Sequence, residues 1–420
     1  MIDLARRSVL VLELNEAERH FLERFVAEGR LPHFARLMRE GVLLSTRVPG
    51  WDARKDRAWR DISPWIVWPS LYTGLLPEEH GIVGFGQDTR HLRGKFVWEV
   101  LDAHRVPVGV FGSLMSYPPR TAGSARFYVP EGLADGPECI PDAARPVQEF
   151  NVLAARNYSE GFARQGVKAL GLLLRSTRHG VRIGTALRTI AQLPAEKLFG
   201  AHREPERAML ASAIAVDAFE ALYREHRPAY AALHLNHVAY MQHRYWRAAE
   251  PQRFEEGLSE TDQRFFGDVA ARRAYEERFA HWIRTSFEYS DRVLGRLVEL
   301  APEGAVVLVA TALGQRPFDP CHEIHNPVVR LVRERELLDA LGLADYTVLH
   351  QMNPDVTVNL RDEASAARAA EAAAGLHVVE DEPLFTVQRR GAQVFLELNM
   401  PRRSALSGEA RIRHRALPGL

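Results

Sequence analysis

Several features that would assign a protein to a class at first sight are scarce in this sequence. It holds only two cysteines, Cys139 and Cys321, far apart, which argues against a disulfide framework and against a cysteine-rich metal site. Neither sign of charge dominates: 54 Lys and Arg residues match 54 Asp and Glu residues, so no global field favours nucleic acid or an anionic membrane. The first apolar run, Val9–Leu12, stops at Glu13 and is too short for a signal peptide core or a membrane span. A cytoplasmic protein with no membrane span and no nucleic-acid partner is the simplest interpretation.

What is present is typical of a large α/β protein. The 420 residues are 46% hydrophobic and 26% charged, which is ordinary for a globular chain, and no internal repeat interrupts them. Apolar segments that suit buried strands alternate with helical patterns, a rhythm that implies a parallel sheet. The expected strands are Ser8–Leu14, Val106–Phe111, Ala229–Leu235 and Ala305–Ala310. We therefore expect a single domain over residues 1–420.

Further elements follow from the same patterns. Helices are expected at Ala17–Glu28, Leu31–Val42, Phe96–His104, Asn236–Trp246, Arg272–Leu300, Glu334–Leu341 and Glu363–Ala374. Strands at Val356–Leu360, His377–Glu380 and Ala392–Leu398 are expected to close the domain.

A helical insertion is expected over residues 146–225. Within it, Lys168–Leu193 mixes Leu and Ile with regularly spaced basic residues, which indicates an amphipathic basic helix or hairpin. We expect an inserted cap that packs over the sheet, with a role at a membrane surface as the alternative.

The stretch from Ser63 to Gly86 organises the chain. It places Pro64, Pro69, Pro77 and four glycines around one short apolar segment. Because proline suits the first helical turn, Pro69 is predicted to open a helix, whose free N–H groups would suit an anion. A buried turn–helix–turn without chemistry explains the same spacing.

The segment W-P-S-L-Y-T-G-L-L-P-E-E-H-G-I resembles the nucleophile segment of the alkaline phosphatase superfamily, in its type I phosphodiesterase/nucleotide pyrophosphatase branch. Two other segments support the resemblance. Leu31–Val42 resembles the family segment that follows the first metal-binding Asp-Gly, and that Asp-Gly corresponds to Asn15-Glu16 here. Gln242, His243 and Trp246 match the motif Q-H-x-x-W. The resemblance implies an alkaline-phosphatase-like three-layer sandwich, with a mostly parallel central sheet flanked by helices and a helical cap.

The resemblance also implies two divalent metals, usually zinc, held by carboxylates and imidazoles. Carried over residue by residue, the positions of one metal site are Asn15, Val67, Ala312 and Leu313, with Val67 at the nucleophile position. Those of the other are Ala239, His243 and, in a weak match, the late histidine His414. Of these seven, only His243 clearly keeps the expected side chain. Standard two-metal hydrolysis of a phosphodiester is therefore predicted to be absent.

Three interpretations remain open. The first is a pseudo-hydrolase that keeps the fold as a binding module for a small, anionic ligand or a protein partner. The second is an enzyme rebuilt at the same strand ends, which would act on a phospho or sulfo ester or another small anionic substrate. Its pocket candidates are Glu13, Asn15, Glu16, Ser70, Thr73, His234, Thr311, Gln315 and Arg316, and its candidate ligands for one new metal are His237, His243 and His322. The third is residual hydrolysis with Ser70 or Thr73 as nucleophile.

Overall fold

The computed structural model describes residues 8–46, 63–82, 87–160, 166–199, 203–254, 258, 262–263, 266–317, 333–349, 355–378, 382–399 and 412–414. Packing divides the chain into two compact units. The first comprises Met1–Phe85, Thr89–Asn157 and Gly161–Pro320, and the second Gly86–Asp88, Tyr158–Glu160 and Cys321–Leu420. The expectation of a single domain over 1–420 stays a prediction.

A five-stranded, all-parallel sheet forms the centre of the first unit. Its strands are β1 (Val9–Leu14), β2 (Val108–Phe111), β3 (Ala125–Val129), β4 (Tyr230–Leu235) and β5 (Val306–Ala310), in the order β3-β2-β4-β1-β5. In the middle of the sheet, Val9 lies opposite Tyr230 of β4 and Val306 of β5. The expected α/β class is confirmed. Strand β3 was not expected, and β5 is an edge strand whose Val306 and Leu308 are exposed, whereas the sequence predicted a buried strand.

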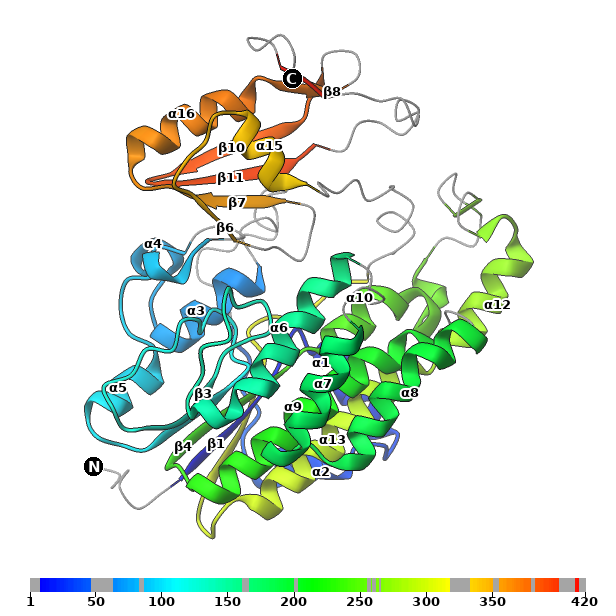
Figure 1. Cartoon of the computed structure of the whole chain (residues 1–420). Coiled ribbons are helices and arrows are strands. Elements are labelled where there is room, and N and C mark those ends of the chain that lie inside the picture. The colour runs from blue at the N-terminus through cyan, green and yellow to red at the C-terminus, as the bar shows by residue number, and fades with distance from the viewer. Residues whose placement is uncertain are drawn as a thin grey trace. The chain divides into compact units, whose positions relative to one another are not determined.

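Helices supply the remaining layers of this unit (Figure 1). They are α1 (Arg19–Ala27), α2 (Pro32–Glu40), α3 (Pro64–Thr73), α4 (Pro77–His80), α5 (Val97–Ala103), α6 (Arg145–Glu160), α7 (Gly166–Ser176), α8 (Ile183–Phe199), α9 (Pro205–His226), α10 (His237–Ala249), α12 (Val269–Phe279) and α13 (Trp282–Leu300). Short 3-10 turns lie at η3 (Thr89–His91), η4 (Asp142–Ala144), η6 (Thr177–His179) and η8 (Pro251–Arg253).

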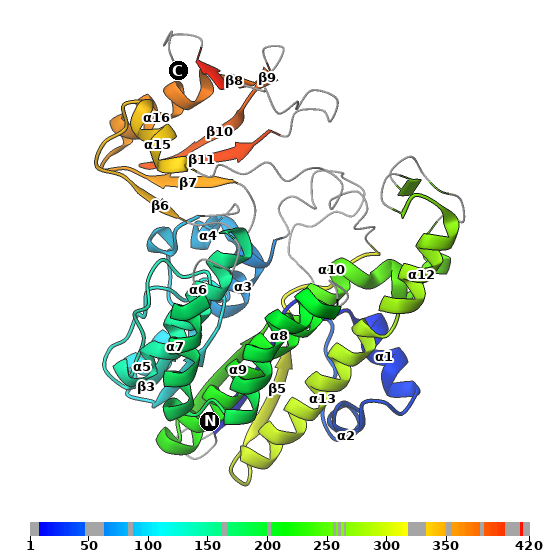
Figure 2. The same ribbon diagram turned by 45° about the vertical axis from the view of Figure 1, so that its right-hand side comes forward.

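The two faces of the sheet bury different halves of β1, because successive side chains of a strand point to opposite sides. Leu10, Leu12 and Leu14 join a large core with residues of α1, α9, α10 and α13. Val11 joins a second core with Val67, Trp68 and Tyr72 of α3. Figure 2 shows the helices α9 and α13 beside strand β5. Helix, sheet and helix thus form three layers, and Glu13 faces the α3 side.

Helix α3 begins five residues before the start that the sequence predicted. Ser63 is its N-cap and accepts a hydrogen bond from Trp65 N, with Pro64 in the first turn, so Pro69 lies inside the helix. The pair Ser63-Pro64 gives both a capping oxygen and a preset φ, which Pro69 alone does not. The prediction that a helix starts at Pro69 is therefore wrong, and so is the anion site predicted at that start.

The helix expected over Arg272–Leu300 is two helices, α12 and α13, separated at Ala280 and His281. Neither residue is a strong helix breaker, so local propensity gives no sign of the break. Both helices pack against α10. Tertiary packing decides where this segment divides.

Where the structure describes residues 146–225 they are mostly helical, as expected, and contain parts or all of α6 to α9. Helix α9 packs directly on β2, β3 and β4, while α8 packs on α9. Whether these helices act as a cap over the site stays a prediction. Among the described residues, no helix combines the length and the apolar character needed to cross a membrane.

The second unit has its own core and its own antiparallel sheets. One sheet has the order β10-β11-β7-β6 and the other β12-β8-β9. The elements are α15 (Glu334–Ala340), β6 (Thr347–Leu349), β7 (Val356–Asn359), α16 (Glu363–Ala374), β8 (Leu376–Val378), β9 (Glu382–Pro383), β10 (Phe385–Arg390), β11 (Gln393–Leu398) and β12 (Ile412–His414). Helix α16 packs on β10 and β11. Strands β7, β8 and β11 were expected from the sequence, but they do not extend the parallel sheet. Strands β6, β9, β10 and β12 were not expected.

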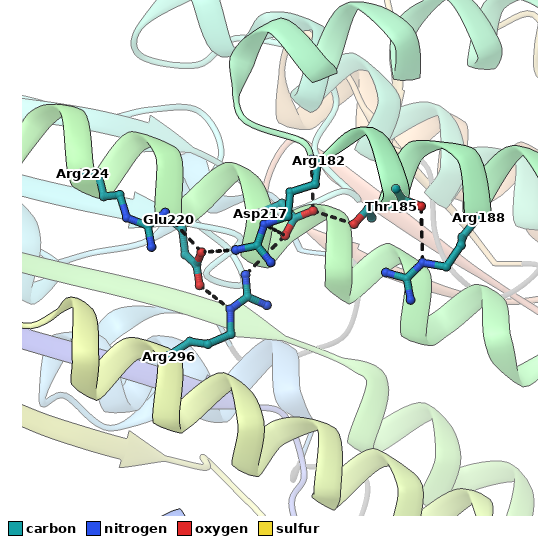
Figure 3. Close-up of polar contacts among 8 residues, drawn as sticks. Arg182, Thr185, Arg188, Asp217, Glu220, Arg224 and Arg296 are labelled. Carbon is teal, nitrogen blue, oxygen red and sulfur yellow. Dashed lines mark hydrogen bonds and ion pairs between the residues drawn. The ribbon is translucent and has the colours of Figure 1, made fainter.

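Two buried acids on α9 join three helices of the first unit (Figure 3). Asp217 accepts hydrogen bonds from the backbone N of Arg182 and from Thr185 Oγ1, at 3.1 and 2.7 Å, and so caps the start of α8. Glu220 pairs with Arg182 at 2.9 Å and with Arg296 of α13 at 2.6 Å. Because both carboxylates are almost fully buried, each depends on these partners.

We expect Asp217→Ala to lower the free energy of unfolding by about 2–4 kcal/mol, because it leaves Thr185 Oγ1 and the backbone N of Arg182 without their buried acceptor and removes one of the two acids that pair with Arg182 and Arg296. Urea unfolding followed by circular dichroism measures the change. The matched control is Asp142→Ala, which removes an exposed ion pair with Arg145 and should cost less than about 1 kcal/mol. Equal losses in the two variants would contradict the prediction.

Candidate functional site

The candidate site lies at the carboxyl edge of the parallel sheet, where open α/β sheets place their ligands. Glu13 is the last residue but one of β1, and Asn15 and Glu16 follow that strand directly. His234 lies opposite Glu13 in the register of β4, so the two side chains share one face. Glu13 and His234, both named from the sequence as candidate groups at strand ends, thus lie side by side.

Glu13 is buried and accepts from three elements at one oxygen. Tyr72 of α3 donates to Glu13 Oε2 at 2.8 Å, and Ser113, after β2, donates at 3.0 Å. His234 Nδ1 lies 3.2 Å from the same oxygen. Burial, with the neighbouring Glu13 carboxylate, raises the pKa of Tyr72 well above its ordinary value, so its hydroxyl remains a donor.

The His234 ring has one nitrogen engaged and one without a partner. The Glu13 carboxylate oxygen accepts from Tyr72 and Ser113 and has no hydrogen of its own to donate. The hydrogen between it and His234 is therefore on Nδ1 of the histidine, which donates it. Nε2 is buried and bonds to nothing among the described residues. The indole of Trp68 stands edge-on to the ring, with centroids 5.0 Å apart. An imidazole that a carboxylate orients in this way, with Nε2 left free, has the geometry of a proton acceptor or a metal ligand.

Asn15, at the first metal-ligand position of the resemblance, is satisfied within the protein. Its Oδ1 accepts from Trp68 Nε1 at 2.8 Å, and its Nδ2 donates to Asn236 Oδ1 at 2.8 Å. Asn236 follows β4 as Asn15 follows β1, so the two amides meet at neighbouring strand ends. Both polar ends of this buried side chain are thus engaged.

Glu16 adopts a left-handed backbone conformation, with φ 54°, at the position where the family motif has glycine. Gln242 Nε2 donates to the Glu16 carbonyl at 2.6 Å, and Gln242 Oε1 accepts from Glu18 N at 3.0 Å. The Glu16 carboxylate pairs with His243 Nε2 at 2.8 Å and accepts from Gln315. The retained residues Gln242 and His243 therefore hold the turn after β1.

The hydroxyls of α3 are engaged in local hydrogen bonds. Ser70 Oγ donates to the carbonyl of Ile66 at 3.3 Å, and Thr73 Oγ1 to that of Pro69 at 2.7 Å. His80 Nδ1 accepts from Ile82 N, so the hydrogen sits on Nε2 and is donated to Ser70 Oγ. Burial lowers the pKa of His80, which keeps this arrangement neutral. His80 therefore serves Ser70 as a donor.

The remaining family positions carry apolar side chains packed in the protein. Val67 and Ala312 belong to one buried cluster, and Leu313 packs against it. Ala239 is buried in α10. Thr311 is exposed and donates to the carbonyl of Leu313 at 2.6 Å.

The other candidate ligands lie elsewhere in the structure. His237 is buried between helices, with Ser212 Oγ 3.0 Å from Nδ1 and Ser290 Oγ 2.9 Å from Nε2, and burial lowers its pKa to about 4. In the second unit, His414 Nε2 lies 2.9 Å from the carbonyl of Ala372. His322 lies outside the described residues. Among the residues that the structure describes, no three His, Cys, Asp or Glu side chains form a group suited to a metal ion.

Sequence reasoning missed four side chains that shape the site: Trp68, Tyr72, Ser113 and Asn236. Asn236 and Ser113 carried a signal, because each follows a strand of the predicted parallel sheet closely. Trp68 and Tyr72 carried none, since their partners Asn15 and Glu13 lie more than fifty residues away in the chain.

Comparison with known proteins assigns the chain to a class. A family model, type I phosphodiesterase/nucleotide pyrophosphatase, matches residues 9–412. The chain belongs to this family, and the resemblance drawn from the sequence is confirmed. No match was found among curated proteins.

Among the solved structures similar to this chain is that of phosphonoacetate hydrolase from Sinorhizobium meliloti 1021 in complex with phosphonoacetate. The identity is 16%, the match covers 94% of this chain and 81% of the other, and the TM-score is 0.36. At that score the likeness adds nothing to the family assignment.

Glu131 lies just beyond β3, at the carboxyl edge of the parallel sheet, and is a buried acid whose pKa is shifted. Ser116 donates to Glu131 Oε2 from its backbone N at 3.1 Å and from its Oγ at 2.9 Å. Burial nevertheless raises the pKa of the Glu131 carboxyl to about 7. The folded protein therefore keeps this proton over a range of pH in which the unfolded chain releases it.

We expect this group to reduce the free energy of unfolding as the pH rises from about 4.5 to about 7, since the unfolded state ionises first. Glu131→Gln should remove this slope and be more stable than the parent by about 1–3 kcal/mol near pH 8, with little difference near pH 5. Urea midpoints at both pH values measure it, and the exposed Glu303→Gln serves as control. A variant that is equally weakened at both pH values would show that Ser116 stabilises the ionised form.

Proposed function

We propose that this chain is a non-catalytic member of its family, a pseudo-hydrolase whose carboxyl edge is kept as a binding site. The observation that carries the proposal is Asn15. It stands where the family resemblance places an anionic metal ligand, and both ends of its amide are bonded to Trp68 and Asn236. The Asn15 amide carries no negative charge, and its oxygen already accepts from Trp68, so it is a much poorer ligand for a divalent zinc ion than the carboxylate expected at this position.

The donors present do not fit the pair of divalent metals that the resemblance implies. Val67, Ala239, Ala312 and Leu313 have no side-chain donor atom, and Val67 and Ala312 are packed in one apolar cluster. Of the two carboxylates nearest the edge, Glu13 accepts from three side chains and Glu16 pairs with His243. Filling a former charged site with apolar side chains avoids the cost of unpaired buried carboxylates.

Neither aliphatic hydroxyl of α3, Ser70 or Thr73, has the base that a nucleophile needs. Ser70 and Thr73 donate to helix carbonyls, and His80 gives Ser70 a hydrogen instead of taking one. Without a base or a metal, a hydroxyl remains a poor nucleophile. Residual hydrolysis through Ser70 or Thr73 is therefore not part of the proposal. A small anionic ligand or a protein partner, and a cytoplasmic location, stay predictions of the sequence.

One observation favours a second candidate, an enzyme rebuilt at the same edge that acts on a small anionic substrate such as a phospho or sulfo ester. His234 Nε2 is buried without a partner among the described residues, while Glu13 holds the other ring nitrogen. A histidine fixed by a carboxylate in this way suits a general base, and it also suits a ligand for a single metal ion.

For the first candidate, we expect added Zn²⁺ or Mn²⁺ not to raise hydrolysis of a nitrophenyl phosphodiester above a heat-treated control. Val67→Thr alone should not restore activity, because the metal-binding carboxylates are missing as well. Release of nitrophenol, followed by absorbance, measures both. Metal-dependent turnover by the parent chain, or recovery from this one substitution, would overturn the proposal.

Metal content separates the two candidates. We expect elemental analysis of protein purified without tag or chelator to give well below one metal ion per chain. A content near one per chain that falls in His234→Gln would instead support a rebuilt one-metal site. His237→Gln is the matched control, because its ring is engaged at both nitrogens by helix groups.

A further inference from the structure

Helix α7 exposes an apolar stripe to solvent. Val167, Leu170 and Leu174 are 88%, 40% and 51% exposed, and their spacing places them on one face of the helix. The opposite face, with Ala169, Leu172 and Leu173, is buried. The helix therefore has two apolar faces, and the residues that the structure describes cover only one of them.

Helix α8 repeats the arrangement. Ile183, Leu187 and Leu198 are 69%, 58% and 77% exposed and share one face, while Thr185 and Ala186 are buried on the side that packs against α9. The turn η6 joins α7 to α8, and the two helices contact each other, as Figures 1 and 2 show. We call these six exposed side chains the hairpin surface. Exposed apolar stripes on two helices that contact each other are typical of an interaction surface.

Basic residues border the hairpin surface. On α7, Lys168 and Arg175 lie next to the apolar stripe, and Arg178 follows in η6. None of the three forms an ion pair with an acid among the described residues. Residues 166–199 contain six Lys or Arg but only one acid, Glu196, which pairs with Arg207 at 2.8 Å. A chain that is neutral as a whole thus carries a strong local excess of positive charge here.

We propose that the hairpin surface binds the surface of an anionic lipid bilayer. The apolar side chains enter the headgroup region, and Lys168, Arg175 and Arg178 contact lipid phosphates and carboxylates. This combination of an exposed apolar stripe and basic borders is the pattern of helices that lie in a membrane interface. The helices lie along the bilayer and do not cross it.

Charge argues against a second copy of the chain as the occupant. In a two-fold dimer the same patch meets itself, so the basic borders of two hairpins would be brought together. Like charges at an interface disfavour the contact, whereas anionic headgroups neutralise them.

The test is co-sedimentation of the full chain with vesicles. We expect binding to vesicles of equimolar phosphatidylserine and phosphatidylcholine, and much weaker binding to phosphatidylcholine alone or at high salt. Leu170→Asp on α7 and Leu187→Asp on α8 should each weaken the partition coefficient at least about tenfold. The double variant Lys168→Gln/Arg175→Gln should lower the partition coefficient by about tenfold or more.

The matched control is Val100→Asp on α5, which replaces an apolar side chain of similar exposure outside the hairpin and should bind like the parent. Circular dichroism confirms that each variant is folded; because all the replaced side chains are exposed, folding should be retained. Failure of the parent to bind the mixed vesicles would overturn the proposal, as would stripe variants that bind like the parent. A concentration-dependent dimer in light scattering that Leu170→Asp dissociates, without an effect on vesicles, would also overturn it and assign the surface to self-association.

Discussion

The burial of Glu13 at the end of β1 is the constraint on which the candidate site depends. All five strands of the sheet are parallel, so their carboxyl ends meet at one edge, and an acid placed there in the interior must find donors. Tyr72, Ser113 and His234 supply them from a helix, a loop and a neighbouring strand. One carboxylate oxygen thus fixes three separate segments relative to β1.

Family residues that this chain retains serve the backbone more than chemistry. Gln242 and His243 hold the strained turn at Glu16. His80 hydrogen-bonds to Ser70 through one ring nitrogen and to the backbone N of Ile82, just after α4, through the other. Where the resemblance expects donors to metal, Val67 and Ala312 pack against apolar neighbours instead. These contacts of the retained residues organise the fold, whatever the edge of the sheet binds.

Overall neutrality conceals an uneven distribution of charge. On one side of α9, Asp217 and Glu220 neutralise Arg182 and Arg296 and so join α8 to α9 and α13 (Figure 3). On the hairpin formed by α7 and α8, Lys168 and Arg175 of α7 face solvent beside an apolar stripe. The pairing inside positions the helices, and the unbalanced charge outside becomes available to an external anionic surface.

The sequence by itself determined the α/β class, most of the elements and the family, because strand and helix patterns and the segment from Trp68 to Ile82 are local signals. It also indicated that Glu13 and His234 lie at strand ends. The partners of these residues, the interior place of Pro69, the break at Ala280 and the exposed stripe of α7 were decided only by the tertiary structure. An amphipathic pattern records that a helix has an apolar face, but which faces are covered depends on segments far away in the chain. The same holds for a buried polar group, whose donors come from wherever the fold brings them.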